Sequence, residues 1–141
     1  MTTLLLALLS TVASAIPLSV TTPTSTSFPV AIWHGLGDRY DSPGLASLAD
    51  DIRSSMDPSP FVYMIRTSND SNADQKSTLF GNMDTELAAV AEQLRGMEEL
   101  RDGFDAIGLS QGGVFLRGYV ERYNLREGYP KIRNLVTLGS P

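Results

Sequence analysis

A serine between two glycines, within Phe104–Val120, constrains the fold more than any other stretch. The apolar run Phe104–Leu109 leads into Gly108-Leu109-Ser110-Gln111-Gly112, and residues at helical spacing follow directly. This G-x-S-x-G pattern predicts a strand, a sharp turn and a helix, because the glycines remove Cβ atoms that would collide where the chain reverses. Ser110 is therefore a candidate nucleophile. The alternative is a glycine-rich β–α turn without a chemical role.

A second glycine-rich loop follows Pro29–Trp33, a short run that predicts a buried strand. The loop, His34–Asp38, is expected at the carboxyl edge of the sheet, where α/β folds place ligands. In serine hydrolases of the α/β class, such a loop and the residue after the nucleophile each supply one backbone N–H of an oxyanion hole. These donors would be the amides of Leu36 and Gln111. A dinucleotide-binding loop is the alternative, but Tyr40 stands where that fingerprint needs its third glycine.

The rest of the chain predicts alternating helices and strands. The first expected helix has Ser42 as its N-cap and Pro43 as its first residue, and Pro58 ends it. The segments expected after it are the strand Phe61–Ile65, the polar loop Thr67–Thr78, the helix Asp84–Leu100, a helix from Ser110 to Gly128, and the strand Ile132–Leu138. Strands that alternate with helices indicate right-handed crossovers and a parallel sheet. We therefore expect an α/β fold.

Charge and composition exclude several classes of function. The net charge of −5 and the absence of a basic cluster make nucleic acid an unexpected partner. The chain has no cysteine, so disulfides, thiol catalysis and cysteine metal sites are excluded. No metal-ligand spacing is visible, and we expect neither a metal nor a cofactor.

The N-terminus predicts the secretory route. Leu4–Ala15 is a short apolar segment that ends in Ala13-Ser14-Ala15, which predicts a signal peptide over residues 1–15 and a mature chain without a transmembrane segment. A buried first helix is the alternative. Residues 16–27 are rich in Thr, Ser and Pro and predict an extended tether. Asn69-Asp70-Ser71 is an acceptor sequon, which makes Asn69 a candidate glycosylation site.

Three stretches together resemble the palmitoyl-protein thioesterase family: Val30–Asp38, Gly108–Arg117 and Ile132–Gly139. The resemblance covers residues 28–141. It implies a lysosomal, vacuolar or extracellular glycoprotein of the α/β-hydrolase fold that cleaves thioester-linked fatty acyl groups. The implied substrates are S-acylated proteins or peptides and fatty acyl thioesters. The family's nucleophile falls on Ser110 and its oxyanion donors fall on Leu36 and Gln111. In one departure, Arg39 and Tyr40 stand where family members carry cysteines.

The catalytic triad is incomplete in this sequence. In α/β-hydrolases an acid and then a histidine follow the serine, but neither Asp nor His occurs after Ser110. The one histidine, His34, is expected to have a structural hydrogen-bonding role, and Glu121 and Glu127 to lie on a solvated helix face. We therefore expect the N-terminal half of an α/β-hydrolase, four parallel strands with crossover helices, in a truncated chain.

Such a chain should be inactive and poorly soluble on its own, because Ile132–Leu138 would be an uncovered apolar edge strand. Two other functions stay open. One is a secreted lipase or carboxylester hydrolase, because the same serine chemistry attacks oxygen esters. The other is a non-catalytic acyl-binding fragment.

Overall fold

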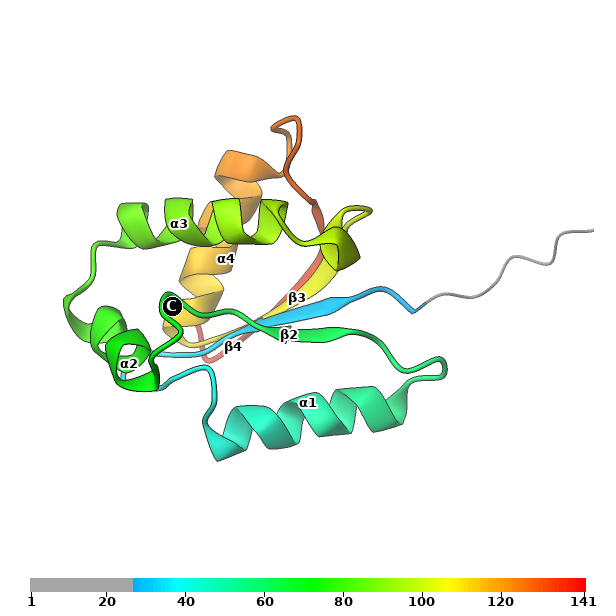
Figure 1. Ribbon diagram of the computed structural model, residues 1–141, viewed down its shortest axis with the longest axis horizontal. Helices are drawn as coiled ribbons and strands as arrows, with labels where there is room; N and C mark the ends of the chain where they lie inside the picture. Colours follow the sequence, from blue (N-terminus) through cyan, green and yellow to red (C-terminus); the bar gives the residue numbers. More distant parts are fainter. Residues whose placement is uncertain (1–26) are drawn as a thin grey trace, which may run out of the picture.

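The computed structural model describes residues 27–141 and has a four-stranded sheet between helices (Figure 1). The elements are β1 (Val30–Trp33), α1 (Pro43–Ser55), β2 (Val62–Met64), α2 (Ser71–Phe80), α3 (Met83–Arg95), a 3₁₀ turn (Glu98–Leu100), β3 (Phe104–Leu109), α4 (Gln111–Tyr123) and β4 (Ile132–Leu138). The strand order is β2-β1-β3-β4 and every pair is parallel, as predicted. The expected signal peptide, residues 1–15, and all but the last residue of the expected tether, residues 16–27, lie outside the described residues.

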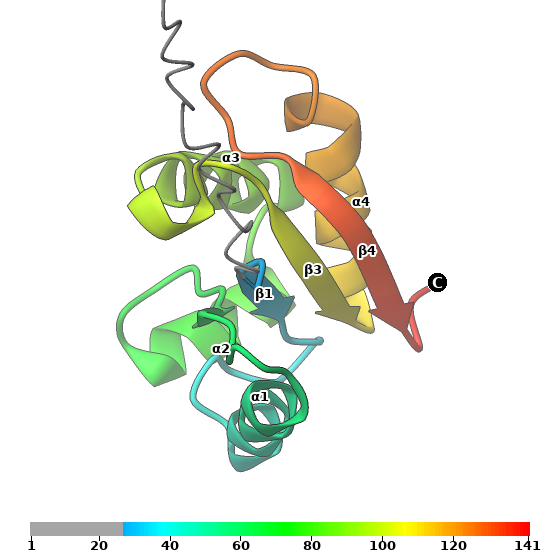
Figure 2. The ribbon, with the colours of Figure 1, turned by 90° about the vertical axis from the view of Figure 1, so that its right-hand side faces the viewer.

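The helices cover the sheet in two layers. Helix α1 lies against one face and α3 and α4 lie against the other (Figure 2). In β1, Val30 and Ile32 pack with α1, whereas Ala31 and Trp33 pack with α3 and α4, so successive side chains enter opposite cores. All residues of β1 are buried, which explains why its sequence is a continuous apolar run.

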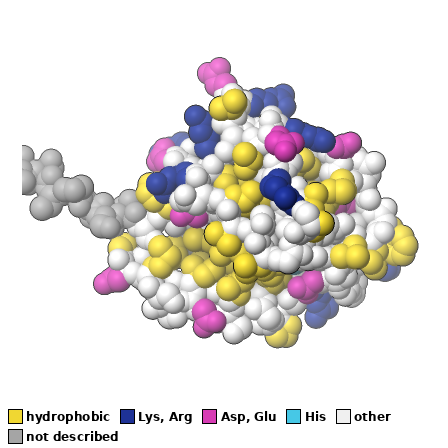
Figure 3. All heavy atoms as spheres, turned by 180° about the vertical axis from the view of Figure 1, so that it is seen from behind, with side chains coloured by type: hydrophobic (Ala, Val, Ile, Leu, Met, Phe, Trp, Pro, Cys, Tyr) yellow, Lys and Arg dark blue, Asp and Glu magenta, His cyan; other side chains and the backbone are white. Residues whose placement is uncertain are grey.

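Strand β4 lies at the edge of the sheet, as the sequence predicts for Ile132–Leu138. Val136 is 50% exposed and Leu138 is 52% exposed. The strand lies at the back of Figure 1, on the side that Figure 3 shows, where hydrophobic side chains gather across the middle of the surface.

The structure corrects three predicted segments. The predicted polar loop Thr67–Thr78 is wrong, because Ser71–Phe80 forms helix α2. This helix buries Asp74 and Thr78, so it has no apolar face that periodicity could detect. The predicted helix Asp84–Leu100 is too long, because α3 ends at Arg95. The predicted helix from Ser110 to Gly128 is also too long, because α4 ends at Tyr123.

Helix α4 makes backbone contact with the sheet at two glycines of the G-x-S-x-G sequence. A Cβ atom on Gly108 would lie 2.4 Å from the Cα of Gly113, and a Cβ atom on Gly112 would lie 2.3 Å from the carbonyl oxygen of Trp33. Backbone atoms cannot move aside as a flexible side chain can. The predicted steric reason for both glycines is thus confirmed.

We predict that Gly112→Ala lowers the free energy of unfolding by about 1–3 kcal/mol, because the added methyl group overpacks the contact between α4 and β1. Gly44→Ala is the matched control, because a Cβ atom there meets nothing within 4 Å. It should leave stability unchanged or raise it by up to about 1 kcal/mol. Urea unfolding measures both variants, and equal stability of the two would contradict this packing.

Candidate active site

Ser110 occupies a strained turn between β3 and α4. Its φ of 50° and ψ of −117° make it the one non-glycine residue with positive φ in residues 27–141. Such backbone costs on the order of 1–3 kcal/mol and persists only where its surroundings enforce it. Here the N–H of Ser110 donates to the Leu138 carbonyl at 2.8 Å, and its carbonyl accepts from Gly113 N–H at 3.1 Å and Ser140 Oγ at 2.6 Å. The turn holds the Ser110 side chain at the surface.

The loop after β1 lies directly against this turn. A Cβ atom on Gly35 would lie 3.1 Å from the Cβ and 3.8 Å from the Oγ of Ser110, so a glycine lets the loop approach closely. The structure thus brings together the two glycine-containing stretches that the sequence singled out.

The two amides predicted as oxyanion donors are unengaged. Among residues 27–141, neither the Leu36 N–H nor the Gln111 N–H has a hydrogen-bond acceptor. Gln111 is the first residue of α4, and the first N–H groups of a helix have no partner within it and favour negative charge. The neighbouring Gly37 N–H differs, because it donates to Thr78 Oγ1 at 2.8 Å.

His34 is buried beneath the loop and forms a pair with Asp74. Its Nε2 lies 2.9 Å from Asp74 Oδ2, without the alignment of a hydrogen bond, so the attraction is mainly ionic. Its Nδ1 lies 3.2 Å from the Gly35 carbonyl oxygen. Because both ring nitrogens face acceptors, the ring fits this place with a proton on each nitrogen. His34 is thus buried and bonded within the fold, as the sequence predicts.

The pKa values of this pair move apart. Burial lowers the pKa of His34, but its contacts with Asp74 and the Gly35 carbonyl outweigh burial, and the pKa is raised. Burial raises the pKa of Asp74, but the His34 ring and the N–H groups of Thr67 and Tyr40 lower it by more, and the resulting pKa is about 2. Both members of the pair are therefore charged from above about pH 2 to at least the ordinary histidine value of 6.5.

Helix α2 supplies the site residues that the sequence reasoning missed. Asp74 accepts from Tyr40 N–H at 2.9 Å and from Thr67 N–H at 2.7 Å, and Gln75 Nε2 donates to the Gly37 carbonyl at 2.6 Å. The sequence signal that could have revealed this helix lies at its N-terminus. Asp70 is a good N-cap residue, whose side chain accepts from the Ala73 N–H at 2.8 Å.

The other residues singled out from the sequence lie apart from Ser110. Glu121 and Glu127 are exposed, and only Glu121 lies within α4. Asn69 is exposed in the loop before α2, and its side-chain oxygen accepts from Arg66 Nε at 2.8 Å. In the described part of the chain, no group of three or more acidic, His or Cys side chains could hold a metal ion. No described helix is both long enough and apolar enough to cross a membrane.

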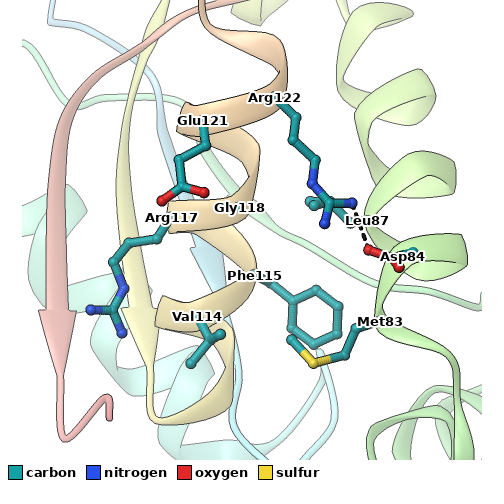
Figure 4. A pocket seen from close by; sticks show the side chains of 9 residues that line it. All are labelled: Met83, Asp84, Leu87, Val114, Phe115, Arg117, Gly118, Glu121 and Arg122. Carbon is teal, nitrogen blue, oxygen red and sulfur yellow. Dashed lines mark hydrogen bonds and ion pairs between the residues drawn. The ribbon is translucent and has the colours of Figure 1, made fainter.

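A hollow of about 330 Å³ lies between α3 and α4 (Figure 4). The Phe115 ring points into it, Leu87 lines it, and the ion pair between Arg122 and Asp84, at 2.6 Å, crosses one wall. Its other lining residues are Met83, Val114, Arg117, Gly118 and Glu121. Four charged side chains in the lining make it a poor match for a long acyl chain.

The described part of the chain is similar to known proteins of one family. Residues 29–141 match the family model described as palmitoyl protein thioesterase. The chain is 36% identical over 124 residues to the palmitoyl-protein thioesterase-dolichyl pyrophosphate phosphatase fusion 1 of Schizosaccharomyces pombe. The aligned region covers 88% of this chain and 19% of that protein.

Two further relatives are more distant. Palmitoyl-protein thioesterase 1 of Caenorhabditis elegans is 27% identical over 79% of this chain and 36% of its own length. Palmitoyl-protein thioesterase 3 of Dictyostelium discoideum is 27% identical over 83% of this chain and 37% of its own length. The chain thus spans between 19% and 37% of the length of these three relatives.

The pair of His34 and Asp74 predicts that stability depends on pH in a specific direction. The raised pKa of His34 means that its contribution is complete below the ordinary value of 6.5 and is lost as pH rises through the folded value. The lowered pKa of Asp74 means that its contribution is complete above 3.8 and is lost as pH falls through about 2. The pair should therefore stabilise the fold most between pH 3.8 and pH 6.5.

Urea unfolding at pH about 5.5 and about 8.5 measures this difference, because His34 is the only histidine of the sequence. We expect lower stability at the higher pH. In His34→Gln, whose amide can donate but does not titrate, the difference should shrink. An unchanged difference in that variant would contradict the assignment.

Proposed function

The chain belongs to the palmitoyl protein thioesterase family, and from this membership we propose that it carries the nucleophile of a hydrolase that removes thioester-linked fatty acyl groups from proteins. The family match supports the general class, a thioesterase-like hydrolase. The parallel α/β arrangement is consistent with the N-terminal half of an α/β-hydrolase. The observation that carries the proposal is the strained turn at Ser110 beside two unengaged amides.

The proposed reaction is acyl transfer through a serine ester. Ser110 Oγ would attack the thioester carbonyl carbon as a base takes the hydroxyl proton, and the thiol would leave with a proton. Water would then hydrolyse the acyl-serine and release the fatty acid. The amides of Leu36 and Gln111 would bind the oxygen as it becomes negative. Loss of one such donor typically costs roughly 3–4 kcal/mol.

The base is not His34 in this proposal. Neither of its ring nitrogens bonds to Ser110, because Nε2 contacts the Asp74 carboxylate and Nδ1 contacts the Gly35 carbonyl oxygen. We propose that a histidine and its orienting carboxylate come from polypeptide outside the 141 residues.

The cellular route is part of the proposal. The apolar segment Leu4–Ala15 supports entry into the secretory pathway, with a lysosome, a vacuole or the exterior as destination. The surface position of Asn69 supports its use as a glycosylation acceptor. Proteins and peptides that carry S-acyl groups are the proposed substrates, and nucleic acid is not a proposed partner.

We predict that Ser110→Ala lowers hydrolysis of a palmitoyl thioester by about 10⁴-fold or more in the full-length protein that carries this chain, because the nucleophile is removed. Ser54→Ala is the matched control, since Ser54 is exposed on α1 and its hydroxyl donates to the Asp51 carbonyl. The 141 residues alone should show no turnover.

Turnover that survives Ser110→Ala would contradict the proposed nucleophile. A triglyceride assayed beside the thioester tests the substrate class. Faster cleavage of the triglyceride would favour a secreted lipase or carboxylester hydrolase instead, and acyl binding without any turnover would favour a non-catalytic acyl-binding protein.

We predict that Asn69 carries a glycan when the full-length protein is made in a secretory eukaryotic host. Enzymatic removal of N-glycans should shift the wild-type protein on a gel by one glycan more than it shifts Asn69→Gln. Asn72→Gln is the control, because Asn72 is exposed nearby but is not part of a sequon. An identical shift for wild type and Asn69→Gln would contradict glycosylation at this site.

A further inference from the structure

The Leu36 N–H belongs to a peptide unit whose carbonyl is held firmly. This carbonyl, on Gly35, accepts from the Asp38 N–H at 3.2 Å and lies 3.2 Å from His34 Nδ1. Because a trans peptide is planar, its carbonyl and its N–H point in opposite directions. Whatever orients the Gly35 carbonyl therefore also orients the Leu36 N–H.

The ring that contacts this carbonyl is itself held by helix α2. His34 and Asp74 have side chains that are 1% and 0% exposed, and they meet at 2.9 Å. Asp74 is in turn held by the N–H groups of Thr67 and Tyr40 and by Thr67 Oγ1, at 2.7 to 3.0 Å. A continuous series of contacts thus runs from α2 through His34 to the Gly35 carbonyl.

Helix α2 also holds the next residue of the loop from both sides. Thr78 Oγ1 accepts from the Gly37 N–H at 2.8 Å, and Gln75 Nε2 donates to the Gly37 carbonyl at 2.6 Å. The same helix reaches the second donor residue, because the side chain of Gln111 donates to the Thr78 carbonyl at 3.3 Å. One helix therefore contacts Gln111 and the residue that directly follows Leu36.

We propose that His34 and Asp74 are positioning residues that aim the Leu36 N–H at the Ser110 turn, and that Thr78 holds the loop in this arrangement. The proposal rests on the proposed function, since it concerns the oxyanion donor of that reaction. In this proposal His34 helps to stabilise the transition state indirectly, because it orients the backbone N–H of Leu36. Positioned donors act where charge develops, so their loss should lower kcat and leave KM almost unchanged.

The test compares His34→Leu with His34→Asn in the full-length protein that carries this chain. Asparagine can place an N–H near the position of Nδ1, whereas leucine cannot. We expect His34→Leu to lower kcat for a palmitoyl thioester by about 100-fold with KM within about twofold. His34→Asn should recover most of that loss. A folded His34→Leu with wild-type kcat, or an equal loss in both variants, would overturn the proposal.

Two variants of Thr78 provide a second test, which does not depend on whether the His34 variants fold. Thr78→Val removes the acceptor for the Gly37 N–H and keeps the shape, and Thr78→Ser keeps the acceptor. We expect a lower kcat in Thr78→Val and a recovery in Thr78→Ser, and equal kcat in the two would overturn the proposal.

Asp70→Ala is the control for a merely structural effect. It removes the cap of α2 without touching the loop, so it should lower Tm and leave kcat unchanged. If Asp70→Ala lowers kcat as much as Thr78→Val, the effect is one of stability and the proposal is overturned. Turnover that survives Ser110→Ala would instead overturn the proposed function, so the two failures are distinguishable.

Discussion

The buried carboxylate of Asp74 connects the parts of the structure on which the candidate site depends. An ionised carboxylate loses several kcal/mol of hydration when it is buried, unless paired charges and hydrogen bonds replace the water. Asp74 obtains these from His34, Tyr40 and Thr67, which lie in the loops after β1 and β2. Removal of any one contact would leave the charge less compensated. The loops and α2 therefore hold one arrangement together.

The strained backbone of Ser110 depends on different contacts. Helix α4 can approach β1 and β3 because Gly108 and Gly112 have no side chains, and this approach leaves Ser110 with a positive φ. Hydrogen bonds from Ser110 to Leu138 and from Ser140 to Ser110 connect the turn to the end of β4. The nucleophile position thus rests on backbone packing, whereas the neighbouring loop rests on a buried ion pair.

This difference explains what the sequence could predict. The turn at Ser110 and the strand Phe104–Leu109 were predictable because steric demand at glycines and apolar runs are local properties. Helix α2 was not, because its buried face consists of Asp74 and Thr78, which become good interior residues only when partners from other loops meet them. The position of His34 was predictable, but its partner was not.

We propose that Ser110 carries the acyl group during turnover. The direct measurement is to mix the full-length protein with a palmitoyl thioester, quench the reaction within the first turnover, and locate the bound acyl group by mass spectrometry of the digested protein. We expect one palmitoyl group, as an ester, on the peptide that contains Ser110. Turnover with the acyl group on another residue, or with no acyl-protein at any time, would contradict it.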